Sequence, residues 1–413
     1  MEAKRIVPMA LAVAVALAAP ARAQNADGRV VLDWNAITVQ LSPPPVLVRN
    51  LAMVHIAAFD AVNAIAPRYE AYLTLPEVTA PTDGRAAAVG AAYGVLRRLQ
   101  PGQAPALDVA LAASLAAIPA GPARTAGLAL GDAAAAAIVA LRASDNFLLP
   151  NPVYVPGTGP AAYQLTPPAF ANPVNQAARL FVPFVMATSD EFQSAGPLAL
   201  SSPKFRQDYD EVRTIGVACA SADACARTPE QTIIALWHTE QAFPQLNRIA
   251  RALAPDRDFD LLDTARTFAL LNMAMADGFI SVFEAKYTYN FVRPVTAIRG
   301  GDADGVPGTE GDPTWTPLLV TPPHPEYPSA HGVIQAAGVE ILKDAFGHRV
   351  GFDAISPGVP GLTRHFEDFD AFVADGQAGR IYGGIHFRTA VEDGVKQGRR
   401  VGRRVRQALR PLE

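Results

Sequence analysis

The chain of 413 residues has few of the residues that mark several common classes of protein, with only 2 cysteines, 7 histidines and 3 tryptophans. Two cysteines exclude a disulfide-dense scaffold, and the spacing of Cys219 and Cys225 matches no zinc or thioredoxin pattern. In an exported protein the pair could form a disulfide that closes a small loop, and two free thiols are the alternative. An excess of basic residues is also missing, because 35 Lys and Arg face 39 Asp and Glu. This balance argues against a nucleic-acid partner.

Long apolar runs are absent after the first 23 residues. The most apolar later stretch, 126–141, is shorter than the roughly 20 residues that span a bilayer, and it contains Asp132. We therefore expect no transmembrane anchor in the mature protein. Alternation of apolar and polar residues with period 2 is also too short everywhere to predict a sheet.

The N-terminus has the pattern of an export signal. A basic pair precedes an apolar stretch at 6–19, and Ala21-Arg22-Ala23 fits a cleavage site. Removing 1–23 takes away three basic residues and one acidic residue, so the formal net charge changes from −4 to −6. We expect a soluble mature protein that is periplasmic or secreted.

Apolar residues with a period near 3.6 dominate the rest of the chain and predict an all-α fold of packed helical bundles. The longest such pattern runs from about 260 to 291, and a helix with an Arg-rich, solvated face is expected at 389–409. The other predicted helices lie at 45–66, 84–98, 103–118, 122–143 and 228–253.

Residues 150–203 interrupt the helical pattern with ten prolines. So long an irregular stretch in a compact protein is usually functional or covers another part of the molecule. Its aromatic residues favour a covering role over a free linker; they are Tyr154, Tyr163, Phe170, Phe181 and Phe184. We expect an N-terminal helical region at 24–200, which includes this segment, and a second helical bundle at 201–413.

Three short motifs in the second bundle carry side chains suited to an oxyanion. In the first, Pro328-Ser329-Ala330-His331 starts a predicted helix, where Ser329 can cap the first turn and the free amides can bind an anion. In the second, Lys286 and Arg293-Pro294 are separated by about two helical turns, which predicts two cations on one face, about 10 Å apart.

The third motif contains Arg380 and His386. Between them, Gly383-Gly384 argues against a regular helix, so the backbone can bend and aim both side chains at one point. His238 and Glu240 fall into no metal-ligand spacing and are interpreted as structural.

Together the motifs resemble the signature K-x6-R-P, P-S-G-H and S-R-x5-H, which is shared by the vanadium-dependent haloperoxidases and the type 2 phosphatidic acid phosphatases. The order and internal spacings agree with this sequence. Three positions depart from the pattern: Ala330 replaces a Gly, Gly379 replaces a Ser, and Val292 stands where soluble haloperoxidase-like members often have Trp.

The resemblance implies two helical bundles with the site in the second, and it assigns a role to each motif residue. The implied oxyanion-binding residues are Lys286, Arg293, Ser329, Ala330 and Arg380. His386 is the implied vanadium ligand in a haloperoxidase, or the nucleophile that becomes phosphorylated in a phosphatase. His331 is the implied general acid–base. His324 and His365 are further candidates for tuning halide choice.

Phosphate and vanadate are both tetrahedral oxyanions, so the signature alone does not separate the two activities. The family's lipid phosphatases are integral membrane proteins, whereas this chain resembles the soluble haloperoxidase-like branch. We therefore expect an enzyme that uses vanadate, hydrogen peroxide and a halide. The alternatives are an exported acid phosphatase that acts on small phosphate esters without vanadate, and a non-catalytic helical protein that binds an oxyanion.

Overall fold

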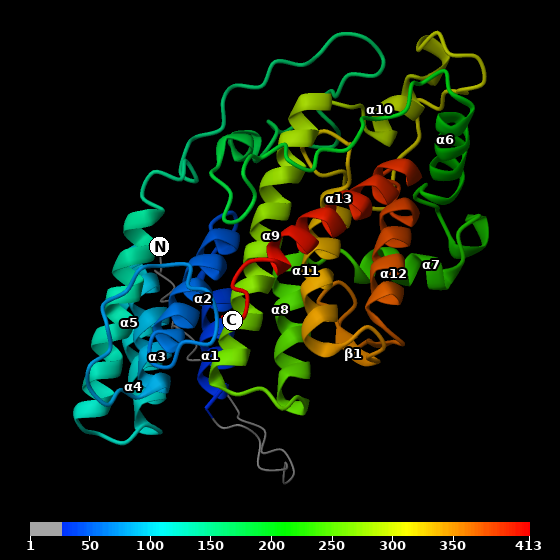
Figure 1. The fold of residues 1–413 in the computed structure, drawn as a ribbon. Coiled ribbons are helices and arrows are strands. Elements are labelled where there is room, and N and C mark those ends of the chain that lie inside the picture. Colours follow the sequence, from blue (N-terminus) through cyan, green and yellow to red (C-terminus); the bar gives the residue numbers. More distant parts are fainter. Residues whose placement is uncertain (1–26) are drawn as a thin grey trace, which may run out of the picture.

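The computed structural model describes residues 27–413 as a mostly α-helical protein with one small β-hairpin (Figure 1). The predicted signal at 1–23 lies outside the described residues. The helices are α1 Arg29–Leu41, α2 Leu47–Asn63, α3 Gly84–Leu99, α4 Ala104–Ala116, α5 Pro122–Leu141, α6 Pro203–Ile215, α7 Pro229–Trp237, α8 Ala242–Leu253, α9 Leu261–Tyr289, α10 Pro294–Arg299, α11 Ala330–Phe346, α12 Phe369–Tyr382 and α13 Arg388–Arg406.

The sequence analysis predicts no strand in the region of the hairpin. Strands β1 Phe352–Ile355 and β2 Thr363–Phe366 pair antiparallel, with Phe352 opposite Phe366. Four residues per strand are too few for a period-2 pattern to be recognised. The hairpin is stabilised by its aromatic side chains, which pack against Phe372 of α12.

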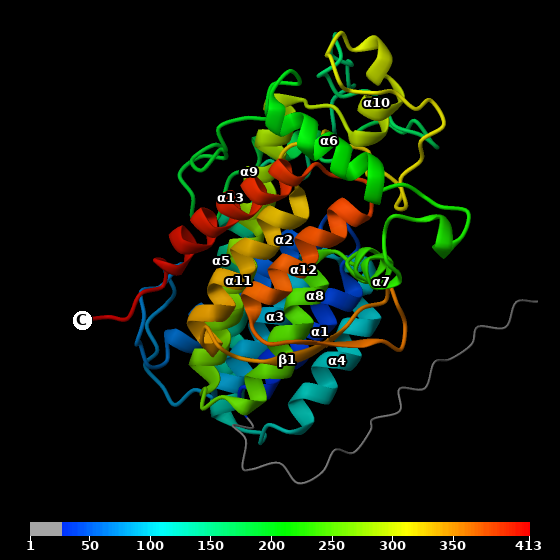
Figure 2. The ribbon, with the colours of Figure 1, turned by 90° about the vertical axis from the view of Figure 1, so that its right-hand side faces the viewer.

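The long helix α9 is the centre of the molecule, and α2 and α11 both pack against it (Figures 1 and 2). It begins with a capping box between Asp260 and Asp263, and its C-cap residue, Asn290, has a left-handed backbone conformation. Gly278 of α9 lies against α11, where an added Cβ would meet Ala337 at 3.3 Å. One continuous hydrophobic core includes residues of the first and the last helices.

Two helices of the described residues are long and apolar enough to span a membrane by length and composition. One is α9, for which 94% of the most apolar window is buried, as expected of a core helix. The other is α5, which begins at Pro122 and has 20 residues, so the argument that 126–141 is too short does not hold. α5 packs tightly on α3, because a Cβ at Gly131 would lie 2.3 Å from the carbonyl oxygen of Ala87.

The irregular segment 150–203 lies over the upper end of α9 in Figure 1. The buried carboxylate of Asp277 in α9 accepts hydrogen bonds from three successive amides of this segment, those of residues 184–186. Tyr163 and Phe184 are buried, as expected of aromatic residues in a covering segment. Phe170 is 59% exposed, so the covering role predicted for it is wrong.

The segment 228–253, predicted as one helix, is divided into α7 and α8. Thr228 forms the capping box that its sequence indicates, so the predicted start is confirmed. The division follows from Pro244, which has no N–H and would leave the carbonyl of Glu240 without a helical partner. That carbonyl is used in the candidate site described below.

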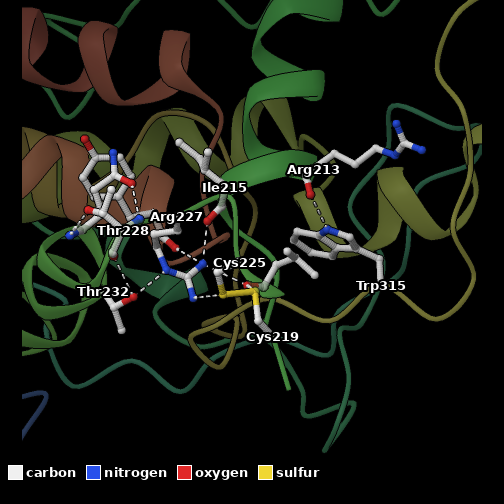
Figure 3. The surroundings of a disulfide bond; sticks show 11 residues. Arg213, Ile215, Cys219, Cys225, Arg227, Thr228, Thr232 and Trp315 are labelled. Atoms are coloured by element: carbon white, nitrogen blue, oxygen red, sulfur yellow. Dashed lines mark hydrogen bonds between the residues drawn. A yellow bond between two sulfur atoms is a disulfide. The ribbon is translucent and has the colours of Figure 1, made fainter. Parts of the chain in front are cut away.

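A disulfide joins Cys219 and Cys225, which confirms the pairing that the sequence allowed (Figure 3). Next to it, the guanidinium of Arg227 donates hydrogen bonds to the carbonyl oxygens of Ile215 and Val217. A longer bond from the same group reaches the carbonyl of Tyr382 at the end of α12. Arg227, which follows the disulfide loop, therefore joins the end of α6 to the element that carries Arg380.

Helices α11 and α13 are in direct backbone contact through a stripe of glycines on α13. A Cβ at Gly394 would lie 2.8 Å from the carbonyl oxygen of Ser329, and one at Gly398 would lie 2.1 Å from that of Val333. Only glycine allows so close an approach. Other side chains of α13 form surface ion pairs, such as that of Arg399 with Asp370.

Candidate active site

The three motifs come together at one end of α9, α11 and α12. The prediction that Lys286 and Arg293 share a helical face is wrong, because α9 ends at Tyr289 and Arg293 is the N-cap of α10. The chain turns at Asn290 instead. Both cations still reach the same segment, since they donate to the carbonyl oxygens of residues 322–326.

Arg293 is the most heavily hydrogen-bonded side chain of the site, and it is fully buried. Its Nε donates to the carbonyl of His324 and its Nη1 to that of Ile385, both at 2.8 Å. Nη1 also lies 3.2 Å from Nε2 of His386. Arg293 therefore holds the last part of the third motif against the segment that leads into α11.

His386 is held between two groups that fix its protonation. Its Nδ1 lies 2.8 Å from Oε1 of Glu326, while Nε2 faces the guanidinium of Arg293, which can only donate. Nδ1 therefore carries the hydrogen, and Nε2 has the lone pair. Burial lowers the pKa of His386 well below its usual value, and Arg293 and Lys286 lower it further. A neutral imidazole with its lone pair on Nε2 can serve as a metal ligand or a nucleophile once it is released from Arg293.

Glu326 is a buried carboxylate that the sequence analysis did not assign to the site. Oε1 also accepts from the amide of Phe387 at 3.0 Å, whereas Oε2 is buried without a hydrogen-bond partner in the described structure. Burial raises the pKa of Glu326 to about 7, although Arg293 and Lys286 oppose this shift. In the sequence, only one feature points to Glu326 as a site residue. It stands two residues before Pro328, in the segment that leads into the first motif.

The start of α11 differs in detail from the prediction. Ser329 is the N-cap residue, but its side chain makes no capping bond, and its amide donates to the carbonyl of Ala390 in α13 at 2.9 Å. The amide of Ser329 is thus not available to an anion. The hydroxyl of Ser329 is available to an anion, because Oγ is fully buried and has no partner among residues 27–413. The first-turn amides from Ala330 onward have no partner within the helix.

Arg380 and His331 are positioned by the chain between α7 and α8. A terminal nitrogen of Arg380 donates to the carbonyl of His238, and Nε2 of His331 donates to the carbonyl of Glu240 at 2.8 Å. The interpretation of His238 and Glu240 as structural holds for their side chains, whereas their backbone oxygens are part of the site. The side chain of His238 is in turn bound to Asp375 at 2.9 Å.

The tautomer of His331 follows from its partner. Since a carbonyl only accepts, Nε2 carries the hydrogen and Nδ1 the lone pair. Burial and the charge of Arg380 lower the pKa of His331 to about 3. Without a bound anion His331 is a neutral base, and a negative ligand nearby would raise its pKa and allow it to act as an acid.

The glycine that replaces the usual Ser before Arg380 has a steric reason. At Gly379 an added Cβ would lie 3.1 Å from the carbonyl oxygen of Ile234 and 3.3 Å from Cβ of His238. α12 therefore approaches α7 closely at this residue. The close approach of α12 to α7 also brings Arg380 to the carbonyl of His238. Arg380 is therefore held in place although glycine precedes it.

The charges of the site suit a tetrahedral oxyanion. Burial lowers the pKa of Lys286 well below its usual value, and it lowers those of Arg293 and Arg380 to about 10; the charge of Arg293 lowers the pKa of Lys286 and Arg380 further. Two buried donors also lack partners in the described part of the chain, Oγ of Ser329 and Nε of Arg380. Three cations and unused donors therefore fit vanadate or phosphate. Within residues 27–413 no group of three or more His, Cys, Asp or Glu could hold a metal ion.

A cavity of about 470 Å³ opens beside these residues and is lined by Ala330, His331 and Arg380. His324 also lines it; its Nδ1 lies 2.9 Å from Nη2 of Arg293. His365, the other histidine considered for halide choice, is on the exposed surface of the hairpin, where it pairs with Asp353.

Comparisons with known proteins bear on the family and the fold of the chain. The family model for the VCPO second helical-bundle domain matches residues 266–412, which include all three motifs. The vanadium chloroperoxidase of Curvularia inaequalis is 25% identical over 406 residues, covering 78% of this chain and 66% of that protein. The chain thus spans slightly less than two-thirds of that relative.

Solved structures show the same fold over nearly the whole chain. A bacterial vanadium-dependent iodoperoxidase has a TM-score of 0.79 and 27% identity, and the match covers 96% of this chain and 99% of that one. A holo-type bacterial vanadium-dependent chloroperoxidase has a TM-score of 0.68 and 19% identity, with 90% and 91% covered. At that identity the second match supports the fold alone.

Proposed function

The chain belongs to the vanadium haloperoxidase superfamily, and from this membership we propose that it is a vanadate-dependent haloperoxidase. In the reaction, hydrogen peroxide oxidises a halide by two electrons: H2O2 + X⁻ + H⁺ gives HOX + H2O. The observation that carries the proposal is the state of His386, a neutral imidazole whose Nε2 lone pair faces a buried cationic site.

The residues that would hold vanadate are those of the three motifs. Nε2 of His386 would be the ligand atom, and Lys286, Arg293 and Arg380 would neutralise the oxygens, assisted by Oγ of Ser329 and the amide of Ala330. Bound vanadate would supply a Lewis-acidic centre that activates hydrogen peroxide toward a halide.

The protein's own groups supply orientation and proton transfer. Glu326 keeps the hydrogen of His386 on Nδ1, which preserves the lone pair on Nε2. His331, fixed by the carbonyl of Glu240, has Nδ1 available to accept a proton from hydrogen peroxide. Once protonated beside a bound anion, the same imidazole can return this proton to the departing oxygen.

The decisive experiment compares two reactions on one protein preparation. Apo-protein is incubated with orthovanadate, hydrogen peroxide and iodide or bromide, and halogenation of a phenol dye is followed. Hydrolysis of a small phosphate ester is measured in parallel without vanadate. We expect vanadate-dependent halogenation that is lost in His386→Ala. Ester hydrolysis without halogenation would replace our proposal with the acid phosphatase.

We also propose that the mature protein, after cleavage of 1–23, is periplasmic or secreted. The export pattern of 1–23 supports this location. The disulfide between Cys219 and Cys225 supports it as well, since such bonds persist in oxidising compartments. Fractionation of expressing cells, followed by N-terminal sequencing of the mature protein, tests both parts.

A further inference from the structure

The cavity beside the motif residues is far larger than the small reactants need. Its volume is about 470 Å³, whereas one water molecule occupies about 30 Å³ in the liquid. Hydrogen peroxide and a halide would fill only a small part of it. Cavities of roughly 300–1,000 Å³ are typical of sites for organic ligands.

One wall of the cavity is a row of aromatic rings from α8 and α9. The ring centroids of Phe243 and Phe279 are 6.0 Å apart, and those of Phe279 and Phe283 are 4.8 Å apart. Phe283 in turn meets the ring of His324 at 5.3 Å. Such tilted rings offer both faces and edges to a further planar ring, which is the arrangement aromatic pairs prefer.

Three polar side chains of the candidate site line the cavity, those of His331, His324 and the cation Arg380. Asn175, Thr239 and Gln241 also line it, and the rest of the lining is apolar. A few converging polar groups in an apolar pocket orient a ligand that has one polar end. At the mouth, Val320 is 74% exposed, so an apolar surface also continues to the solvent.

We propose that this cavity binds the organic acceptor of the halogen, an electron-rich aromatic compound of the phenol class. Its ring would lie against Phe243, Phe279 and Phe283, with its hydroxyl toward His331 and Arg380. This inference rests on the proposed function and names the substrate that the same site serves. The halogen would be transferred to a bound molecule before hypohalous acid escapes.

The chemistry of this transfer is balanced without a further reactant. The hypohalous acid formed from hydrogen peroxide and halide reacts with an aromatic C–H: HOX + ArH gives ArX + H2O. The C–X bond forms as the O–X bond breaks, and the ring proton leaves with the hydroxide as water. Electron-rich rings react fastest because the halogen is electrophilic.

The first test is a competition between a small and a bulky phenol of similar reactivity toward reagent hypohalous acid. We compare the ratio of halogenated small phenol to halogenated bulky phenol. With the vanadate-loaded protein we expect this ratio to be at least fivefold higher than with reagent hypohalous acid. In Val320→Trp the indole should close the mouth to both phenols, so halogenation would take place in solution and the ratio should return toward that of the reagent. Products are normalised to the triiodide that the same variant forms without acceptor.

Val109→Trp is the matched control, because Val109 is 72% exposed on α4 and does not line the cavity. It should keep the wild-type ratio. A wild-type ratio equal to that of the reagent would overturn the proposal, since it would show that halogenation takes place in solution.

A second readout does not depend on catalysis. Saturation-transfer difference NMR of p-cresol with the apo-protein should give a signal that Val320→Trp weakens and Val109→Trp retains. If the wild type forms no triiodide, the proposed function fails, and this arm still decides about the cavity. No p-cresol signal would overturn the aromatic site itself.

Discussion

Nδ1 of His386 lies 2.8 Å from Oε1 of Glu326, and both side chains are buried. A carboxylate behind a ligating imidazole fixes its orientation and increases its basicity. Here the carboxylate also titrates near neutral pH, because burial raises its pKa to about 7. The pair therefore connects the affinity of the site for an oxyanion to the pH.

The first prediction concerns this dependence on pH. When Glu326 is ionised, its negative charge offsets Lys286 and Arg293 and disfavours a bound anion, and we expect this repulsion to outweigh the basicity that the carboxylate adds to His386. We expect Glu326→Gln, which keeps the oxygen that accepts from His386, to bind vanadate about tenfold more tightly than wild type at pH 8.5. At pH 6 the two should bind equally. Isothermal titration calorimetry at several pH values measures the ratio of the vanadate dissociation constants of wild type and variant. The ionisation of vanadate affects both constants equally and cancels in this ratio.

The matched variant Glu326→Ala separates charge from positioning. It removes the partner of His386 Nδ1, so vanadate affinity should fall about 10- to 100-fold at every pH. If Glu326→Gln and wild type showed the same pH profile, the carboxylate would not be the titrating group.

The same carboxylate predicts how stability depends on pH in the absence of a ligand. Its folded-state pKa of about 7 lies above the ordinary value of 4.5, so the folded protein binds more protons between these values. The free energy of unfolding should therefore fall as the pH rises through this window, and it should stay lower above pH 7. In Glu326→Gln this contribution is absent. Urea unfolding at pH 5 and pH 8 should show the stability of the variant relative to wild type increasing with pH.

Ser329 gives a prediction in which affinity and stability move in opposite directions. Its hydroxyl is fully buried and has no partner in the described residues, which costs free energy until a ligand oxygen arrives. Ser329→Ala should raise the free energy of unfolding of the apo-protein by up to about 1 kcal/mol and weaken vanadate binding about 5- to 10-fold. A loss of stability in this variant would mean that the hydroxyl has a structural partner.

For Arg380 the shape of the side chain matters as well as its charge. One nitrogen of the guanidinium is bound to the carbonyl of His238, while Nε is buried and unpaired within residues 27–413. Lysine keeps the charge but cannot make both contacts. We expect Arg380→Lys to weaken vanadate and phosphate about 10- to 100-fold, whereas Arg399→Lys on the surface of α13 should leave both affinities unchanged.

Much of the fold could be predicted because the helices have strong apolar periodicity and clear ends. The break at Gly383-Gly384 is an example, since Gly384 has φ +73° and an added Cβ there would lie 2.4 Å from the carbonyl oxygen of Gly216. The β-hairpin and the division of 228–253 were missed, because both depend on contacts or on one proline rather than on a repeated pattern.

The candidate site could be predicted only where a motif marks it. The three motifs do come together, and the comparisons confirm the family resemblance and the helical fold. Glu326 and the carbonyls of His238 and Glu240 could not be found in the same way. These groups belong to the site only because the folding of α7, α8 and the segment before α11 places them there.

Gly379 provides the last prediction, because it tests why this chain departs from the family pattern. Restoring the usual residue with Gly379→Ser would place a side chain 3.1 Å from the carbonyl oxygen of Ile234. We expect the free energy of unfolding to fall by about 1–3 kcal/mol. Vanadate affinity should fall too, because α12 must move away from α7 and takes Arg380 with it. Gly102→Ser is the control, since an added Cβ there meets nothing within 4 Å. If urea unfolding gave equal stability for both variants, the close approach of α12 to α7 would not be the reason for the glycine.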